Sequence, residues 1–245
     1  DMDFESGCYT IEKLGNLDVG FDYYAPQSFL DAEGKRVTIA WQNGWLWMPW
    51  CENWGPTGQE NWRGAFSVPR TVSLSEDQNV KLYPVRELWP LEYEPQEYCD
   101  YEVTTQRQYL HPADGKSFQM ELFIDIEKVT SRYLEIGVLG KGEKATVVEV
   151  DLLQKIVSID KSRSDRYGRG RMNCPVEIQD GKLKLLILVD CSIVEVYVDG
   201  GRYCITSNVY PKIEQTECWI DVPYKQAKID KMKIASMKRF WESEG

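Results

Sequence analysis

The second half of this 245-residue chain consists of short segments in which apolar and polar side chains alternate. The clearest segment is 118–126, where the apolar positions are Phe118, Met120, Leu122, Ile124 and Ile126. A period of two places alternate side chains on opposite faces of a strand, so that one face is buried and the other is mostly in water. Residues 1–90 show no sustained helical period. The chain is therefore predicted to be all-β.

Turn residues separate these segments at short intervals. Further long strands are expected at 133–139, 145–150, 155–159, 183–189, 193–198, 203–209 and 228–235, and shorter ones at 28–30, 36–41 and 65–74. The sequence Asp199-Gly200-Gly201-Arg202 predicts a hairpin turn, because glycine tolerates the positive φ angles of a tight reversal. About eight strands with this punctuation predict an antiparallel β-sandwich.

A change of composition divides the chain. The stretch 85–97 contains Pro90 and Pro95 and is rich in acidic residues, which is typical of a linker with at most one helical turn. We therefore predict a first domain over residues 1–90, a linker over 91–100 and a sandwich domain over 101–245.

The charge balance limits the partners. With 39 acidic and 29 basic residues the net charge is -10, which disfavours nucleic acid and anionic membranes as partners and is compatible with a neutral ligand such as a glycan. No stretch approaches the roughly 18 consecutive apolar residues of a membrane span, and no signal segment is recognised. We expect a soluble cytoplasmic protein, with secretion as the alternative.

The seven cysteines are an odd number, are widely spaced and form no C-x-x-C pair, and His111 is the single histidine. This pattern predicts free thiols in a reducing compartment, and no disulfide framework. It also predicts no metal site, and nothing in the sequence implies a cofactor.

Six of the nine tryptophans lie between residues 41 and 62, directly after the polar and aromatic stretch 18–29. Aromatic faces pack on the C–H side of a sugar ring, while carboxylates and amides bind its hydroxyl groups. A single Trp in a β-rich protein is more often a core residue. The cluster as a whole favours a sugar site.

Five segments resemble glycoside hydrolase family 32 in order and spacing. This family contains invertases, levanases, inulinases and sucrose-6-phosphate hydrolases, which act on β-fructofuranosides. The segments are 18–29 (DVGFDYYAPQSF), 39–45 (IAWQNGW), 62–70 (WRGAFSVPR), 82–88 (LYPVREL) and 189–201 (VDCSIVEVYVDGG). The resemblance implies the last roughly two blades of a five-bladed β-propeller, followed by the family's C-terminal β-sandwich.

In this family a retaining mechanism uses two carboxylates, a nucleophile and an acid/base. They lie in a Trp-Met-Asn-Asp-Pro-Asn-Gly motif and a Glu-Cys-Pro motif, with a transition-state-stabilising Arg-Asp-Pro motif between them. The chain contains none of these motifs, because Glu217-Cys218-Trp219 lacks the proline and falls in the expected sandwich. The resemblance therefore implies no catalytic residue here and a complementary N-terminal half as partner, and a start at Asp1 within an expected strand agrees with this.

The resemblance carries over sugar-binding positions. Tyr24 and Trp45 match residues that line the fructose pocket and the adjoining sugar site. Asp18 and Asp22 match polar positions that help to hold the leaving sugar in relatives. Asp18 can equally cap a turn through Gly20, whereas Asp22 favours the site.

Several charged residues have simpler explanations. Arg63 or Arg70 could clamp the phosphate of a phosphorylated sucrose, but pairing with a carboxylate inside the protein is favoured for both. The basic stretch from Lys161 to Arg171 is interpreted as a solvated loop, and His111 as a turn residue.

Three interpretations remain open. The chain is the C-terminal half of a β-fructofuranosidase, a non-catalytic module that binds fructan, or an assembly module whose sandwich forms a homo-oligomer. The expected ligand is sucrose or a fructo-oligosaccharide, and the sequence does not select among sucrose, sucrose-6-phosphate, levan and inulin.

Overall fold

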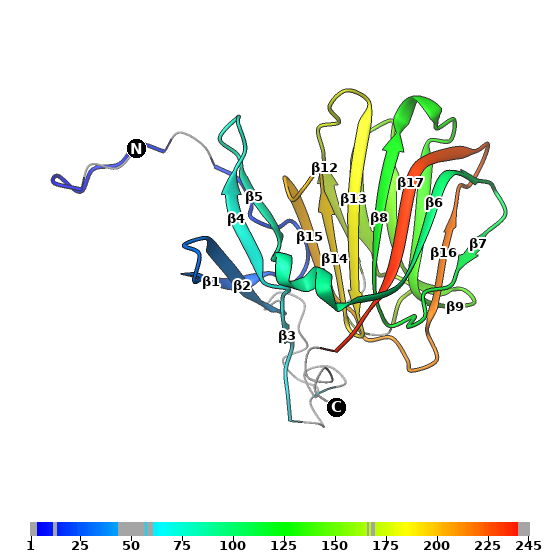
Figure 1. The fold of residues 1–245 in the computed structure, drawn as a ribbon, viewed down its shortest axis with the longest axis horizontal. Helices are drawn as coiled ribbons and strands as arrows, with labels where there is room; N and C mark the ends of the chain where they lie inside the picture. The colour runs from blue at the N-terminus through cyan, green and yellow to red at the C-terminus, as the bar shows by residue number, and fades with distance from the viewer. Residues whose placement is uncertain are drawn as a thin grey trace.

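The computed structural model describes residues 4–11, 14–43, 57, 61–165, 167 and 170–239. Within these residues the strands form one five-stranded sheet and two six-stranded sheets. Figure 1 shows the five-stranded sheet beside the two larger sheets, which lie face to face. This arrangement confirms the predicted all-β class, a partial propeller followed by a sandwich.

The five-stranded sheet is antiparallel and has the order β1-β2-β4-β5, with β3 paired to β2. Its strands are β1 (Tyr24–Leu30), β2 (Arg36–Gln42), β3 (Ala65–Phe66), β4 (Arg70–Leu74) and β5 (Val80–Pro84). Strand β1 is exposed along its whole length, whereas β2 is mostly buried. We call this unit the propeller sheet, and β1 is its free edge within the described chain.

The single strand predicted over residues 65–74 is wrong, because the structure has two strands there. The ladder breaks at Ser67, because the Ala40 N–H donates to the Ser67 hydroxyl at 3.0 Å in place of a backbone carbonyl. Pro69 has no N–H to donate to a ladder, so it separates β3 from β4.

The sandwich consists of the two six-stranded sheets. One has the order β12 (Arg171–Pro175), β11 (Ile156–Asp160), β10 (Lys144–Asp151), β9 (Tyr133–Lys141), β16 (Glu217–Asp221) and β7 (Gln108–Leu110). The other has the order β15 (Tyr203–Asn208), β14 (Ile193–Val198), β13 (Lys182–Asp190), β8 (Ser117–Asp125), β17 (Ala227–Met237) and β6 (Glu92–Val103).

The inner faces of the two sheets form one hydrophobic core. The alternating apolar residues of β8 that the sequence singled out, Phe118 to Ile124, are almost completely buried in it. Ile136 of β9 and Val148 of β10 belong to the same core from the opposite sheet. The alternation therefore located the buried face of β8 correctly.

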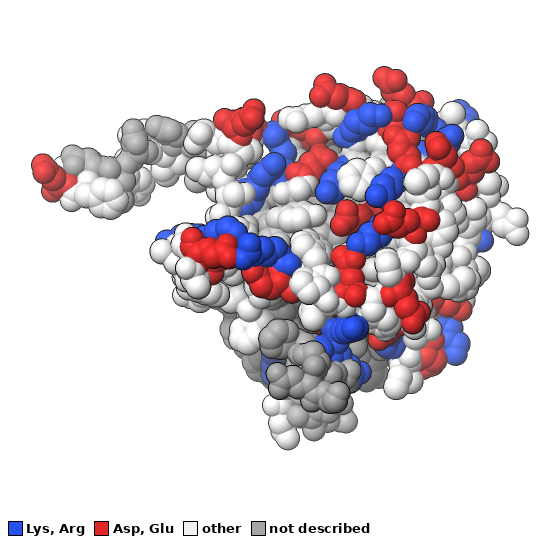
Figure 2. Space-filling view, viewed as in Figure 1, with Lys and Arg blue, Asp and Glu red and all other residues white. Residues whose placement is uncertain are grey.

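Most of the stretch 91–100 that we expected to be a linker is strand. The 3-10 helix η2 (Arg86–Leu91) is followed at once by β6, which pairs with β17. The acidic bias of this stretch has a cross-strand explanation: Asp100 pairs with Lys228 at 2.9 Å and Glu97 with Lys231 at 3.6 Å. Figure 2 shows these intermixed charges over the outer face of the sandwich. The division into two domains stays a prediction.

The short 3-10 helix η3 (Ile126–Lys128) follows β8 directly. None of the helices in the described ranges has the length and apolar character that a membrane span requires.

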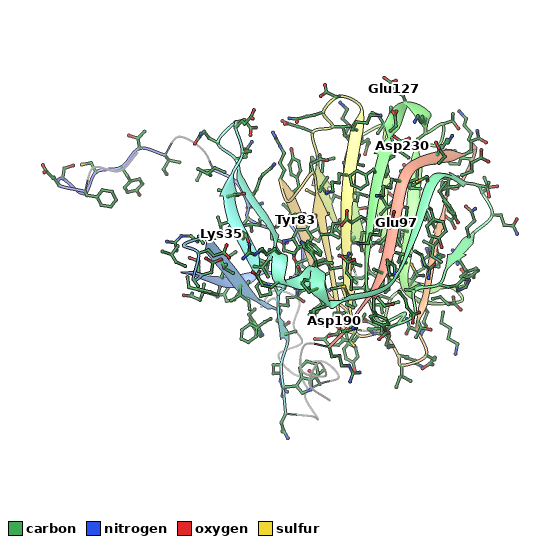
Figure 3. All side chains as sticks on the ribbon, viewed as in Figure 1. Lys35, Tyr83, Glu97, Glu127, Asp190 and Asp230 are labelled. Carbon is green, nitrogen blue, oxygen red and sulfur yellow. The ribbon has the colours of Figure 1, made fainter. Side chains whose placement is uncertain are left out.

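The propeller sheet packs on the outer face of β13, β14 and β15. Leu82 of β5 belongs to a buried cluster with Leu186, Leu188, Tyr197 and Cys204 of the sandwich. The ring of Tyr83, a residue of β5, packs against the sandwich, with its centroid 5.9 Å from that of the Tyr197 ring (Figure 3). The predicted hairpin turn after β14 is confirmed, and it reaches this contact, where the Leu82 N–H donates to the Gly201 carbonyl at 3.0 Å.

The two glycines of this turn give a matched test of the contact. Gly201 has φ +85°, and an added Cβ would lie 2.0 Å from the Leu82 carbonyl oxygen, whereas a Cβ on Gly200 (φ +65°) would meet nothing within 4 Å. We expect Gly200→Ala to cost about 1 kcal/mol of unfolding free energy and Gly201→Ala roughly 3 kcal/mol or more, measured by urea unfolding. Equal costs would show that the close approach to β5 does not matter.

Candidate functional site

The first residue of β1, Tyr24, presents its ring at the free edge of the propeller sheet. Its side chain is about half exposed, and the ring lies edge-on to Trp41 of β2 with 6.3 Å between centroids. Trp41 is fixed in turn, because its indole N–H donates to the Arg63 carbonyl at 3.1 Å. Tyr24 therefore has the exposure and the support that a sugar-stacking residue needs.

Trp45, the other predicted stacking residue, lies outside the described residues. The chain leads to it through Gln42 and Asn43, which are both buried at the end of β2. The fixed end of β2 is therefore three residues away from Trp45.

The Asp18 carboxylate is buried and accepts four hydrogen bonds from protein groups. Oδ1 accepts from the N–H groups of Gly20 at 2.7 Å and Thr206 at 3.0 Å. Oδ2 accepts from Arg70 Nη1 at 2.8 Å and the Thr206 hydroxyl at 2.6 Å. The turn with Gly20 that the sequence allowed is therefore present. The predicted sugar contact of Asp18 stays a prediction.

Asp22 is also fully buried against the sandwich. Its Oδ2 accepts from the Asn208 N–H at 2.7 Å and lies 3.4 Å from Lys161 Nζ. Its own N–H donates to the Thr206 carbonyl at 3.2 Å. The predicted sugar contact of Asp22 is likewise untested by this geometry, which shows a contact with β15.

Residues 18–22 thus cover the free edge of β15. The backbone adds one further bond, from the Val19 N–H to the Cys204 carbonyl at 2.9 Å, and the two Asp side chains accept the N–H groups of Thr206 and Asn208. A Cβ on Gly20 would lie 2.0 Å from the Thr206 carbonyl oxygen, so only glycine allows this approach. The motif next to Tyr24 therefore protects an edge strand that would otherwise have unpaired backbone groups.

Arg70 is the centre of a buried polar cluster that joins the propeller sheet to the sandwich. Besides Asp18, its guanidinium group donates to Glu195 Oε2 at 3.0 Å, to the Tyr197 hydroxyl at 2.9 Å and to the Thr206 hydroxyl at 2.5 Å. We call Arg70, Asp18, Glu195, Tyr197 and Thr206 the Arg70 cluster. The expected pairing of Arg70 with a carboxylate is confirmed, so this side chain is not free to clamp a phosphate.

The electrostatics of the Arg70 cluster favour a charged guanidinium group. Burial alone would lower the pKa of Arg70, but Glu195, Tyr197 and Asp18 hold this pKa well above its ordinary value. The Tyr23 ring also covers the guanidinium group, with 4.4 Å between the guanidinium carbon and the ring centroid.

Sequence reasoning missed Glu195, although a signal was present. In β14, Val194, Val196 and Val198 face the core, so Glu195 shares the opposite face with Tyr197. A charged residue inside a strand that is otherwise apolar indicates either a wet face or a buried partner. The burial of Glu195 shows the second.

Lys161 corrects the interpretation of the basic stretch 161–171 as a wholly solvated loop. Its side chain is 1% exposed, and Nζ donates to the Asn208 carbonyl at 2.8 Å besides its contact with Asp22. It also lies 4.5 Å from the centroid of the Phe21 ring. Alternation could not reveal this, because Lys161 follows β11 and its partner is 139 residues away in the sequence.

The chemistry available at this site follows from these pairings. Asp18, Asp22 and Glu195 are all buried beside Arg70 or Lys161. A carboxylate held in this way is not placed to attack or protonate a substrate. Across the described ranges, no group of three His, Cys, Asp or Glu side chains has a geometry suited to a metal ion.

His111 lies in the connection after β7, and its carbonyl accepts from Gln96 Nε2 at 2.7 Å.

The fold is a partial propeller followed by a sandwich, and the free edge of the propeller sheet carries the exposed ring of Tyr24. The family model "Glycosyl hydrolases family 32 N-terminal domain" matches residues 1–84, and "Glycosyl hydrolases family 32 C terminal" matches residues 91–236. The chain belongs to glycosyl hydrolase family 32.

Relatives and solved structures agree with this assignment. The chain is 32% identical over 204 residues to a sucrose-6-phosphate hydrolase of Zymomonas mobilis, covering 80% of this chain and 37% of that protein. It is 32% identical over 203 residues to the Staphylococcus xylosus enzyme of the same name, covering 79% of this chain and 38% of that protein. The sucrose-6-phosphate hydrolase structure from Lactobacillus gasseri matches with a TM-score of 0.79 at 20% identity, covering 97% of this chain and 46% of that chain. The chain thus spans less than half the length of each.

Arg70→Met tests the cohesion of the Arg70 cluster. The substitution leaves the buried carboxylates of Asp18 and Glu195 without their cation, so we expect a loss of about 3–5 kcal/mol of unfolding free energy in urea titration. Adding Asp18→Asn and Glu195→Gln should restore part of it. The matched control is Arg86→Met. Arg86 forms exposed ion pairs with Glu33 and Glu87, and their loss should leave the unfolding free energy unchanged. Similar midpoints for the two Arg variants would contradict the structural role.

The buried ammonium group of Lys161 predicts a pH dependence of stability. Burial lowers its pKa in the folded chain, and Asp22 opposes part of this shift. The unfolded chain then keeps the proton to higher pH, so this group makes the unfolding free energy rise as the folded ammonium group loses its proton. As the pH rises towards the ordinary Lys pKa of about 10.4, the stability difference between wild type and Lys161→Met should shift towards the wild type. Lys35→Met, at an exposed turn, controls for loss of a surface charge, and a constant difference for Lys161→Met would refute the prediction.

Proposed function

We propose that the chain forms the C-terminal half of a glycoside hydrolase that cleaves terminal β-D-fructofuranosides, sucrose or fructan, with retention of configuration. One observation supports this most directly. The family segment 18–29 is bound to the sandwich so that Tyr24 is exposed at the edge of the propeller sheet, while the neighbouring carboxylates are buried in ion pairs. In this proposal the chain supplies sugar contacts and a scaffold.

Hydrolysis in this proposal requires the N-terminal half of the propeller. The sequence has no Trp-Met-Asn-Asp-Pro-Asn-Gly, Arg-Asp-Pro or Glu-Cys-Pro motif, which hold the nucleophile, the transition-state stabiliser and the acid/base in the family. The exposed apolar side chains of the propeller sheet fit a surface that further blades cover; Phe29, Leu30 and Phe66 are 55%, 59% and 70% exposed. The N-terminal half is therefore the proposed partner.

Tyr24 and Trp45 are the proposed contacts to the fructose and to the adjoining sugar. Asp18 and Asp22 remain candidates for the leaving sugar, and their bonds to β15 give them a second role, which is to hold Tyr24 in place. The names of the two relatives above add sucrose-6-phosphate to the candidate substrates. We also propose a reducing, cytoplasmic location, which agrees with free thiols at all six described cysteines.

Fructose release tests the proposal. The purified chain alone should release no fructose from sucrose or sucrose-6-phosphate. It should release fructose once combined with a chain that supplies the N-terminal half of the propeller. Release by the chain alone would place the catalytic carboxylates within it. No release by the combination, together with calorimetric binding of fructan to the chain, would support a binding module instead.

Substitution of Tyr24 tests the sugar contact. In the combined enzyme, Tyr24→Ala should lower kcat/KM by about tenfold, because a stacking contact contributes roughly 1–2 kcal/mol. A similar loss is expected for Trp45→Ala. The matched control is Tyr224→Ala in the sandwich, where Tyr224 is 45% exposed compared with 48% for Tyr24. An unchanged kcat/KM for Tyr24→Ala would remove this residue from the site.

A further inference from the structure

Glu195 belongs to the sandwich, yet its carboxylate contacts two segments of the propeller sheet. Oε1 accepts from Gln42 Nε2 at 2.5 Å and from the Val68 N–H at 2.9 Å. Gln42 ends β2, and Val68 lies in the connection between β3 and β4. One oxygen of one side chain therefore fixes the end of β2 and the connection between β3 and β4, at positions 26 residues apart in the sequence.

The second oxygen of Glu195 is held just as firmly. Oε2 binds Arg70 at 3.0 Å and accepts a hydrogen bond from the Tyr197 hydroxyl. The residue is completely buried, so these protein groups determine its orientation. A carboxylate with both oxygens fixed is a rigid reference point from which the end of β2 is positioned.

The end of β2 retains polar groups that do not add to stability. Gln42 Oε1 and Asn208 Oδ1 are buried and have no hydrogen-bond partner in the part of the chain that the structure describes. Asn208 Nδ2 also donates to the Gln42 carbonyl at 3.1 Å. Buried acceptors without partners are uncommon, and natural proteins keep such costly features mainly where function requires the geometry.

The fixed strand end leads directly to the proposed sugar contacts. Trp41, the residue before Gln42, supports the Tyr24 ring, and Trp45 follows Gln42 by three positions. Gly64 packs against the same strand end, because a Cβ there would lie 2.5 Å from Trp41 Nε1 and 2.8 Å from the Gln42 carbonyl oxygen. Movement of Gln42 would therefore displace Trp41 and, through it, the Tyr24 ring.

We propose that Glu195 is a positioning residue for the sugar site: through Gln42 and Val68, the sandwich sets the place of the Tyr24 ring, the proposed contact to the fructoside. The inference rests on the proposed function. It assigns the sandwich a part in substrate affinity, in addition to its part in cohesion. Glu195 itself does not touch the substrate.

A split between KM and kcat distinguishes this role from a merely structural one. In the combined enzyme, Glu195→Met should raise KM for sucrose about tenfold, because Met removes the acceptor for Gln42 and Val68. It should change kcat per folded molecule less than about twofold, because the proposed catalytic carboxylates lie in the other half. Gln42→Met leaves the ion pairs of Arg70 intact and should reproduce the increase in KM. The double variant should show no further increase, since both changes remove one interaction.

Ile136→Ala, a core substitution in the opposite sheet of the sandwich, is the control for lost stability. It should lower the melting temperature and leave KM unchanged. The inference is overturned if Glu195→Met and Gln42→Met lower the melting temperature with KM unchanged, or if their effects on KM add. Absence of fructose release by the wild-type combination would instead refute the proposed function.

Discussion

The guanidinium group of Arg70 is completely buried and lies between two carboxylates that belong to different parts of the fold. Asp18 precedes the propeller sheet, and Glu195 is on the outer face of the sandwich. Desolvation of three charged groups is costly, and it is compensated only where each oxygen and each N–H finds a partner. The Arg70 cluster meets this condition through Tyr197 and Thr206. The cluster therefore fixes the position of the propeller sheet relative to the sandwich. Apolar contact alone would leave the two free to slide.

The same junction also covers the free edge of β15. An edge strand normally has unpaired N–H and C=O groups. Here the segment 18–22 occupies that edge with backbone N–H donors and side-chain carboxylate acceptors. Asp18 and Asp22 are spaced so that they accept from Thr206 and Asn208, two residues apart on one strand edge. The same segment then continues into β1 and Tyr24. The protection of a sandwich edge and the presentation of an aromatic ring are therefore functions of one short stretch.

The sequence was sufficient for the elements with strong local signals. The alternation in β8 predicted its buried face, and paired glycines predicted the turn after β14. Strands β7, β12 and β16 were not predicted, because they are short and have no sustained alternation. Glu195 and Lys161 were missed for a different reason. Their partners are far away in the sequence, and no periodicity within a strand shows whether a charged side chain meets water or a buried counter-ion.

The buried carboxylates of Asp18, Asp22 and Glu195 differ from the carboxylates that hydrolysis requires. Retaining hydrolysis needs one carboxylate free to attack and another free to exchange a proton. The three buried carboxylates at the junction of the propeller sheet and the sandwich do neither, because they are held in ion pairs with Arg70 and Lys161. Their charge instead fixes the backbone that leads to Tyr24 and to the end of β2. In the proposed function, the sandwich and the propeller sheet supply the rigid geometry of one wall of the sugar site, and the N-terminal half of the propeller supplies the chemistry.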